Sequence, residues 1–263
     1  MELGDIMEAI MTLQELTRFF GGLSAVNKLN LKVQSEEILS LIGPNGAGKT
    51  TVFNLITGSL IPTQGKVFFQ DQDITRLRPY ETTALGVART FQTTSLFYDD
   101  TVLDNLMVSY RCRTRMGFWD ALIQTPRCRE DERRCRQKAE EILELIGLSE
   151  RASKLANNIP HESQKRLAVG MALVTEPKLL LLDEPMGGLS EEENNSMMTL
   201  IQKVRKQGIS ILLIEHKMKV VMNISDRVVV LNYGQKIAEG LPMEVGSNQA
   251  VIEAYLGAGY TEF

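Results

Sequence analysis

Hydrophobic and polar positions alternate with a two-residue period over residues 11–33 of this 263-residue chain. This period predicts half-buried, antiparallel strands. Apolar runs at residues 38–42, 179–182 and 209–214 predict further strands, the last two of them buried within a sheet. From residue 101 to about 158, apolar positions recur at the i, i+3, i+4 spacing that predicts a helical lobe.

Residues 43–50 join the strand at 38–42 to an amphipathic run at 52–56, and they have the form G-x-x-x-x-G-K-T. Small residues at this spacing let successive backbone N–H groups surround phosphate oxygens, and the following helix directs its positive end at them. Lys49 would reach the β- and γ-phosphates, and the Thr50 hydroxyl would ligate Mg²⁺. A glycine-rich turn that binds nothing is the alternative, but the strand before the loop and the helix after it favour phosphate binding.

Four leucines at residues 179–182 lead directly into Asp183, Glu184 and Pro185. The pattern resembles a Walker B strand, which would place Asp183 at the carboxyl end of the sheet and let it hold Mg²⁺ through water. Glu184 could orient or deprotonate an attacking water. The simpler alternative is a buried strand that ends in a polar turn, and Pro185 supports it. The phosphate-binding loop elsewhere in the chain favours the functional interpretation.

Three further residues are ambiguous when each is taken alone. Phe20 precedes a glycine pair and could stack on an adenine, although a core phenylalanine at a strand end explains it equally well. Gln92 ends a short apolar strand and could touch Mg²⁺ or orient water, but a lone glutamine is more often a solvated side chain. His216 follows the strand at 209–214 and could contact a γ-phosphate, whereas such a histidine is more often an ordinary hydrogen-bonding residue.

Composition narrows the classes of partner. The chain carries 29 basic and 33 acidic residues, and its net charge of -4 gives no reason to expect nucleic acid or anionic lipid. The arginine-rich stretch 111–136 contains interspersed acids and a helical period, which favour a solvated helix face. The longest apolar run, at residues 167–174, is shorter than the roughly 18 to 20 residues that cross a bilayer.

The cysteines and the start of the chain bear on its location. Cys112, Cys128 and Cys135 follow no zinc-binding or C-x-x-C spacing, so we expect reduced thiols in an intracellular setting. The acidic first residues lack the basic region of a secretory signal. We therefore expect a cytoplasmic protein.

Residues 43–50, Gln92, the pair Asp183 and Glu184, and His216 stand in an order that resembles the ATP-binding subunit of ABC transporters. The resemblance covers nearly the whole chain. It implies an α/β fold of the P-loop NTPase type, with a mostly parallel sheet, an N-terminal antiparallel β subdomain and an inserted α-helical subdomain.

The resemblance also implies how the chain is divided. Residues 1–263 would form a single ABC ATPase domain. Its catalytic core, with the β subdomain, would comprise residues 11–98 and 177–263, and residues 99–176 would form the helical subdomain.

The chain is still more similar to one branch of this family, the ATPase subunits of branched-chain amino acid importers. That likeness is carried by residues 43–51, 53–58, 86–92, 113–117, 214–222 and 251–257. It implies an enzyme that hydrolyses ATP to power import of branched-chain or related hydrophobic amino acids. The solute is implied by the likeness alone, because an ATPase subunit does not touch it.

The resemblance assigns roles to individual residues. It implies catalytic roles for Glu184, His216 and Gln92, with Thr50, Gln92 and Asp183 as the residues that hold Mg²⁺. In this family a D-loop also follows the Walker B strand, here at residues 188–190. The residues implied in ATP binding are Phe20, Val26, Gly43, Pro44, Asn45, Gly46, Ala47, Gly48, Lys49, Thr50 and Thr51.

One segment departs from the family pattern. The family carries a signature close to L-S-G-G-Q before the Walker B strand, and this chain has Ile159, Pro160, His161, Glu162 and Ser163 there. In the family dimer, the signature serine and glycine N–H groups hold the γ-phosphate bound by the other subunit. Proline has no N–H group, and the two side chains after it add bulk where glycines allow close approach. We expect the helix to start normally, but its anion-binding end to be impaired.

The departure shapes the expected partners. We expect a second ATPase subunit, a different chain whose intact signature completes the site over Lys49, and two membrane-spanning permease subunits. A periplasmic or extracellular solute-binding protein would act through the permease, and the chain would lie on the inner face of the membrane. The alternative is a regulatory subunit that binds ATP with little hydrolysis, against which Glu184 argues.

Overall fold

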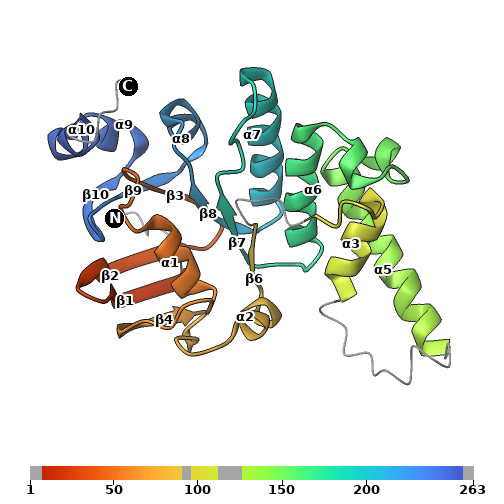
Figure 1. Ribbon diagram of the computed structural model, residues 1–263, viewed down its shortest axis with the longest axis horizontal. Helices are drawn as coiled ribbons and strands as arrows, with labels where there is room; N and C mark the ends of the chain where they lie inside the picture. Colours follow the sequence, from red (N-terminus) through yellow and green to blue (C-terminus); the bar gives the residue numbers. More distant parts are fainter. Residues whose placement is uncertain (1–7, 91–95, 112–125, 257–263) are drawn as a thin grey trace, which may run out of the picture. The chain divides into compact units, whose positions relative to one another are not determined.

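The computed structural model of the protein describes residues 8–90, 96–111 and 126–256. The chain divides into two compact units. The first contains the residues up to Arg89, Lys178–Glu184 and those from Ile201 onward, and the second contains Thr90–Pro177 and Pro185–Leu200. Both β-sheets of the described chain belong to the first unit (Figure 1).

The first sheet is antiparallel and has the order β2-β1-β4-β5 over the described residues. Strands β1 and β2 align Leu13 with Leu31, and residues 29–33 of β2 alternate between buried and exposed, as expected for a sheet with one face in contact with solvent. The alternation over residues 11–33 therefore predicts these strands correctly. The strands are β1 (Ala9–Phe20), β2 (Leu23–Gln34), β4 (Gln64–Phe69) and β5 (Gln72–Asp73).

The second sheet has the order β10-β9-β3-β8-β7-β6 within the described ranges. Its neighbouring strands run parallel except for the hairpin of β9 and β10. The carboxyl ends of β3, β7 and β8 therefore lie along one edge, where α/β folds place their ligands. The strands are β3 (Ile38–Ile42), β6 (Val87–Arg89), β7 (Leu179–Asp183), β8 (Ser210–Ile214), β9 (Arg227–Asn232) and β10 (Gln235–Gly240).

One hydrophobic cluster links the two sheets through the helix that follows the phosphate-binding loop. It joins Leu13 and Val67 of the antiparallel sheet to Leu39 and Leu212 of the parallel sheet, and Phe53 of the helix is completely buried among them. The helices of this unit are α1 (Lys49–Ile56), α2 (Pro79–Leu85), α8 (Met218–Ile224), α9 (Pro242–Gly246) and α10 (Gln249–Leu256).

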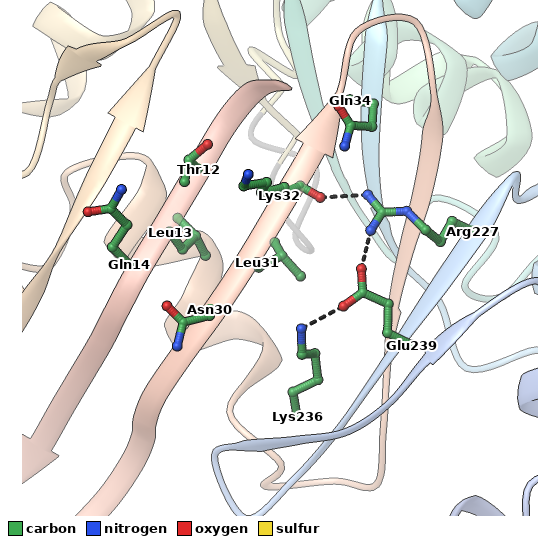
Figure 2. Close-up of a pocket in the computed structure, with 10 residues that line it drawn as sticks. All are labelled: Thr12, Leu13, Gln14, Asn30, Leu31, Lys32, Gln34, Arg227, Lys236 and Glu239. Atoms are coloured by element: carbon green, nitrogen blue, oxygen red, sulfur yellow. Dashed lines mark hydrogen bonds and ion pairs between the residues drawn. The ribbon is translucent and has the colours of Figure 1, made fainter. Parts of the chain in front are cut away.

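Arg227 connects β2 and the residues that follow it to the β9–β10 hairpin. It donates to both oxygens of Glu37, at 2.7 and 3.3 Å, and to the backbone oxygen of Lys32 at 2.6 Å, and it also pairs with Glu239. Beside this network lies a pocket of about 420 Å³ with polar walls (Figure 2). Arg227 and Lys236 both pair with Glu239 inside the β9–β10 hairpin. The bond from Arg227 to the Lys32 oxygen then fastens this hairpin to β2 of the other sheet.

The second unit is helical over its described residues. The helical period predicted from residue 101 corresponds to α3 (Val102–Arg111), α5 (Pro126–Leu145) and two 3₁₀ turns, Ser149–Arg151 and Ala156–Asn158. They are followed by α6 (His161–Leu173) and the start of α7 (Glu191–Arg205). None of the helices in the described ranges combines the length and apolar character that crossing a bilayer requires.

Two local features position these helices. Gly170 lets α6 approach α5 closely, because a Cβ atom there would lie 3.2 Å from the Ile142 side chain of α5 and 2.7 Å from the Ile146 side chain just after it. Ser190 and Glu193 form a capping box at the start of α7, with each side chain bonded to the other's backbone N–H group.

Candidate functional site

The phosphate-binding loop leaves β3 at Gly43 and enters α1 at Lys49. Gly43, Gly46 and Gly48 all have positive φ, at 148°, 80° and 101°. A Cβ atom on Gly43 would meet the Leu231 backbone oxygen at 2.1 Å, and one on Gly48 would meet the Ala25 oxygen at 2.3 Å. The loop therefore needs glycine both for its backbone shape and for its close approach to β2 and β9.

Lys49 is buried and folds back over its own loop. Its Nζ donates to the backbone oxygens of Gly43 at 2.6 Å and Pro44 at 3.0 Å. Burial lowers the pKa of Lys49 below its usual value, and the carboxylates of Glu184 and Asp183 partly offset this effect. The side chain thus has two carbonyl partners that a phosphate can replace.

The ends of β7 and β8 bring two predicted catalytic residues together. Asp183 pairs with Ile214 across the sheet, and the Glu184 N–H donates to the Ile214 oxygen at 2.9 Å. Glu184 has a left-handed φ of 50°, an uncommon backbone for this residue type. Its Oε1 lies 2.7 Å from Nε2 of His216. The two side chains form a hydrogen-bonded pair at the edge of the sheet.

Asp183 is buried and paired with an arginine from the neighbouring strand. Its Oδ2 accepts a hydrogen bond from the Arg89 guanidinium at 2.8 Å. Burial raises the pKa of the Asp183 carboxyl, and the Arg89 charge works in the opposite direction. The sequence analysis does not single out Arg89. An arginine directly after Val87 and Ala88 at a strand end signals a buried charge, but its partner Asp183 depends on the pairing of β6 with β7.

The predicted adenine platform lies at the turn between β1 and β2. Phe20 is 44% exposed, and the Arg18 guanidinium lies 4.8 Å from the centre of its ring. Val26, in contrast, is completely buried in the hydrophobic core. Its neighbour Ala25 presents a backbone oxygen to Gly48, so β2 contacts the loop through Ala25. No pattern in the sequence distinguishes Ala25 from its neighbours.

The segment at the signature position starts α6 in the helical unit. Pro160 is the N-cap, and His161 is the first helical residue. Glu162 pairs with Arg166 at 2.7 Å, and Ser163 is buried and accepts a hydrogen bond from Arg151. The negative charge of Glu162 is thus balanced within its own helix.

The predicted D-loop lies against this segment. A Cβ atom on Gly188, in the predicted D-loop, would lie 3.3 Å from Nε2 of His161, so the imidazole packs against a glycine with φ 78°. Gln92 lies outside the described residues. The strand that the sequence predicts to end at Gln92 ends at Arg89 instead.

The described residues contain no cluster of three or more His, Cys, Asp or Glu side chains arranged to hold a metal ion. Mg²⁺ sites commonly take one or two carboxylates and complete their coordination with hydroxyl, water and phosphate oxygens. The Thr50 hydroxyl and the Asp183 carboxylate are donors of that kind.

Comparison with known proteins identifies the family of the chain. Residues 26–187 match the ABC transporter family, and residues 235–261 match a family described as the branched-chain amino acid ATP-binding cassette transporter. The chain belongs to the ABC transporter ATP-binding family. Members of this family are ATPases, and the regulatory alternative is not favoured for this ABC ATPase.

Full-length relatives agree with this assignment. The ABC ATPase is 43% identical to the high-affinity branched-chain amino acid transport ATP-binding protein LivG of Escherichia coli (strain K12), over 95% of this chain and 98% of LivG. It is 42% identical to the protein BraF of Pseudomonas aeruginosa, over 94% of this chain and 98% of BraF.

Solved structures support the fold. A nucleotide-free ATP-binding cassette from an ABC transporter superposes with a TM-score of 0.83 at 31% identity, covering 94% of this chain and 99% of the other. The ADP conformation of an ATP-binding cassette of an ABC transporter superposes with a TM-score of 0.83 at 31% identity, covering 95% of this chain and 99% of the other. The ABC ATPase has the P-loop NTPase fold that the sequence predicts.

Proposed function

We propose that this chain is the ATP-hydrolysing subunit of a membrane importer for branched-chain or related hydrophobic amino acids. The observation that carries the proposal is the 43% identity with LivG over 95% of the chain. LivG is named for branched-chain amino acid transport. The hydrogen-bonded pair of Glu184 and His216 supports the hydrolytic part of the proposal.

The phosphate-binding loop suits a nucleotide on two grounds. Its glycines at positions 43 and 48 could not carry a side chain, so backbone N–H groups stay free to line the loop. The Thr50 hydroxyl, the Asp183 carboxylate and the Gln92 amide offer the hard oxygen atoms that Mg²⁺ prefers. A bound Mg²⁺ ion would neutralise charge on the β- and γ-phosphates.

The roles of the protein groups follow from their positions. Lys49 would exchange the carbonyl oxygens of Gly43 and Pro44 for phosphate oxygens. Glu184 would orient the attacking water and accept its proton, and His216 would hold the Glu184 carboxylate and contact the γ-phosphate. Phosphoryl transfer depends mainly on such positioning and charge stabilisation.

Partners are part of the proposal. We expect two permease subunits in the membrane, a solute-binding protein outside it, and this ABC ATPase on its cytoplasmic face. Phe97 is 48% exposed in the helical unit and is a candidate contact with a permease.

A second ATPase chain completes the proposed complex. Pro160 has no N–H group, and Glu162 and Ser163 are held by arginines of the same chain. The α6 N-terminus therefore offers little to a phosphate on another subunit, and we propose that the other chain supplies an intact signature over Lys49. The reciprocal site would be weak.

Uptake in cells that lack this gene tests the whole proposal. We expect the wild-type chain to restore uptake of radiolabelled leucine, isoleucine and valine, and Glu184→Gln not to restore it. Glu253→Gln, an exposed change on α10, is the matched control and should restore uptake fully. If the wild-type chain left the uptake of these three solutes unchanged, the solute assignment would be refuted. The ATPase assignment would still stand.

A further inference from the structure

Arg89 joins three elements of the first unit. Its side chain is only 8% exposed, and it donates to Asp183 Oδ2 at 2.8 Å and to Asn54 Oδ1 at 2.5 Å. Its guanidinium also lies 5.3 Å from the centre of the Phe53 ring. The residue thus connects the end of β6 with the end of β7 and with α1.

The residues of α1 that Arg89 contacts lie one helical turn after Thr50. Asn54 follows Thr50 by four residues and Phe53 follows it by three. These spacings place all three side chains on the same face of the helix, one turn apart. Arg89 therefore grips α1 one turn beyond the residue whose hydroxyl would hold Mg²⁺.

The other end of the link is Asp183, the carboxylate that would hold the same ion. Its side chain is 1% exposed, so its position is set by protein contacts and not by solvent. An arginine suits this task because its planar fork reaches two acceptors at once, whereas the ammonium of a lysine is a point charge.

We propose that Arg89 is a positioning residue that sets the spacing between Thr50 and Asp183 and so tunes divalent-cation affinity. The inference rests on the proposed function, namely that the chain binds Mg-ATP. Arg89 would act by holding the Asp183 carboxylate and α1 in one register, without contacting the nucleotide. Residues that orient metal ligands in this way typically contribute about 10- to 100-fold to metal affinity.

The test uses Mn²⁺ in place of Mg²⁺ and ADP as the nucleotide, with bound Mn²⁺ measured by electron paramagnetic resonance on the full chain. We expect Arg89→Met to weaken Mn²⁺ binding to the ADP complex at least about tenfold. Affinity for ADP in EDTA should change by less than about threefold, because Arg89 does not touch the nucleotide. Arg89→Lys should also weaken Mn²⁺ binding, since it keeps the charge but loses the fork.

Asn54→Leu distinguishes the contact of Arg89 with α1 from its ion pair with Asp183. It removes the acceptor on α1 and leaves the ion pair with Asp183 in place, and we expect Mn²⁺ affinity to fall about three- to tenfold. It also keeps the inference testable if Arg89→Met does not fold. Arg205→Met is the matched control, because it removes a different arginine–aspartate pair, Arg205 with Asp226 at 3.3 Å, away from Thr50. It should bind Mn²⁺ like the wild type.

The outcomes separate the two claims. Wild-type Mn²⁺ affinity in folded Arg89→Met, or in Arg89→Lys or Asn54→Leu, would overturn the positioning role and leave the Mg-ATP function intact. An equal loss of Mn²⁺-ADP and metal-free ADP binding in Arg89→Met would also overturn it, because that pattern indicates general damage to the loop. A wild-type chain that binds ADP but no Mn²⁺ would refute the proposed metal site itself.

Discussion

His216 Nε2 and Glu184 Oε1 lie 2.7 Å apart, at the ends of two adjacent parallel strands. Asp183 and Ile214 pair across these strands, so the sheet register places the residues that follow them side by side. The contact fixes the direction of the Glu184 carboxylate, whose backbone already has a left-handed conformation. Two residues more than 30 positions apart in sequence therefore form one unit.

Neutralising Glu184 should abolish turnover without abolishing binding. We expect Glu184→Gln to lower kcat about 10²- to 10⁴-fold in the assembled transporter, because the water loses its base. ATP affinity should change little, and His216→Ala should show the same pattern. Phosphate-release kinetics and nucleotide titration measure the two effects. Unchanged kcat in Glu184→Gln would contradict the assigned role.

The pKa of Lys49 predicts how nucleotide binding depends on pH. Burial lowers this pKa in the nucleotide-free chain, so the affinity for ADP should begin to fall at a lower pH than an ordinary lysine would allow. Between the lowered value and the usual value near 10.5, the unfolded chain binds more protons, so the free energy of unfolding should rise with pH.

Lys49→Arg is the control for this prediction. A guanidinium stays charged throughout the alkaline range. The variant should bind ADP more weakly but lose the alkaline decline, as measured by calorimetric titration from neutral to strongly alkaline pH. An identical decline in the variant would assign the pH dependence to another group.

Phe19 and Phe20 offer a matched pair for the adenine platform. They are similarly exposed, at 41% and 44%, but they point to opposite faces of β1. Loss of one aromatic stack with a base costs about 1–3 kcal/mol, so Phe20→Ala should weaken ATP binding about 5- to 160-fold. Phe19→Ala should leave ATP binding near the wild-type value. Equal effects of both substitutions would mean that Phe20 is not the platform.

Restoring the signature should strengthen a homodimer. We expect replacement of residues 159–163 by Leu-Ser-Gly-Gly-Gln to raise the ATPase rate of the purified homodimer at least about tenfold, because the serine restores an N–H group and a hydroxyl at position 160 and the two glycines remove bulk from the helix end. Arg166 tolerates the loss of Glu162, since it also donates to Ile146 and Ser196. A wild-type homodimer that hydrolyses ATP as fast as the complex with the second chain would refute the proposal that the two ATP sites are unequal.

Arg227 should be among the most costly surface arginines to replace. Its partner Glu37 has a side chain only 5% exposed and would keep the hydrogen bond from the Gln34 N–H but lose its counter-ion. Removing one partner of a buried ion pair destabilises a fold by about 3–5 kcal/mol. We expect Arg227→Met to lose about 3 kcal/mol in urea unfolding, and Arg227→Met with Glu37→Gln to recover part of this. Arg205→Met, which breaks a half-exposed pair, should cost less than about 1 kcal/mol.

The sequence predicts the parts of this fold that depend on local pattern. The alternation over residues 11–33, the leucine strand before Asp183 and the glycine loop before Lys49 each leave a periodic or spaced signal. The ion pair of Glu162 with Arg166 also has a sequence signal, because the two residues stand at i and i+4.

Other features could not be predicted because they depend on strand register. Arg89 meets Asp183 only because β6 and β7 are neighbours, and sheet order is not written in either strand. Ala25 touches Gly48 through a backbone oxygen, a group that every residue carries. Val26 is buried in the core, and only the three-dimensional structure shows that its side chain is shielded.

The turn between β9 and β10 has a consequence for biosynthesis. The Gly234 N–H donates to the Ala47 oxygen at 3.0 Å, and Leu231 closes the space beside Gly43. The phosphate-binding loop is therefore completed by residues that leave the ribosome long after the loop itself. These contacts cannot form before the hairpin has been synthesised, so we expect a nascent chain to acquire nucleotide affinity only once this hairpin has emerged. ATP binding would then report that the β9–β10 hairpin has packed against the loop.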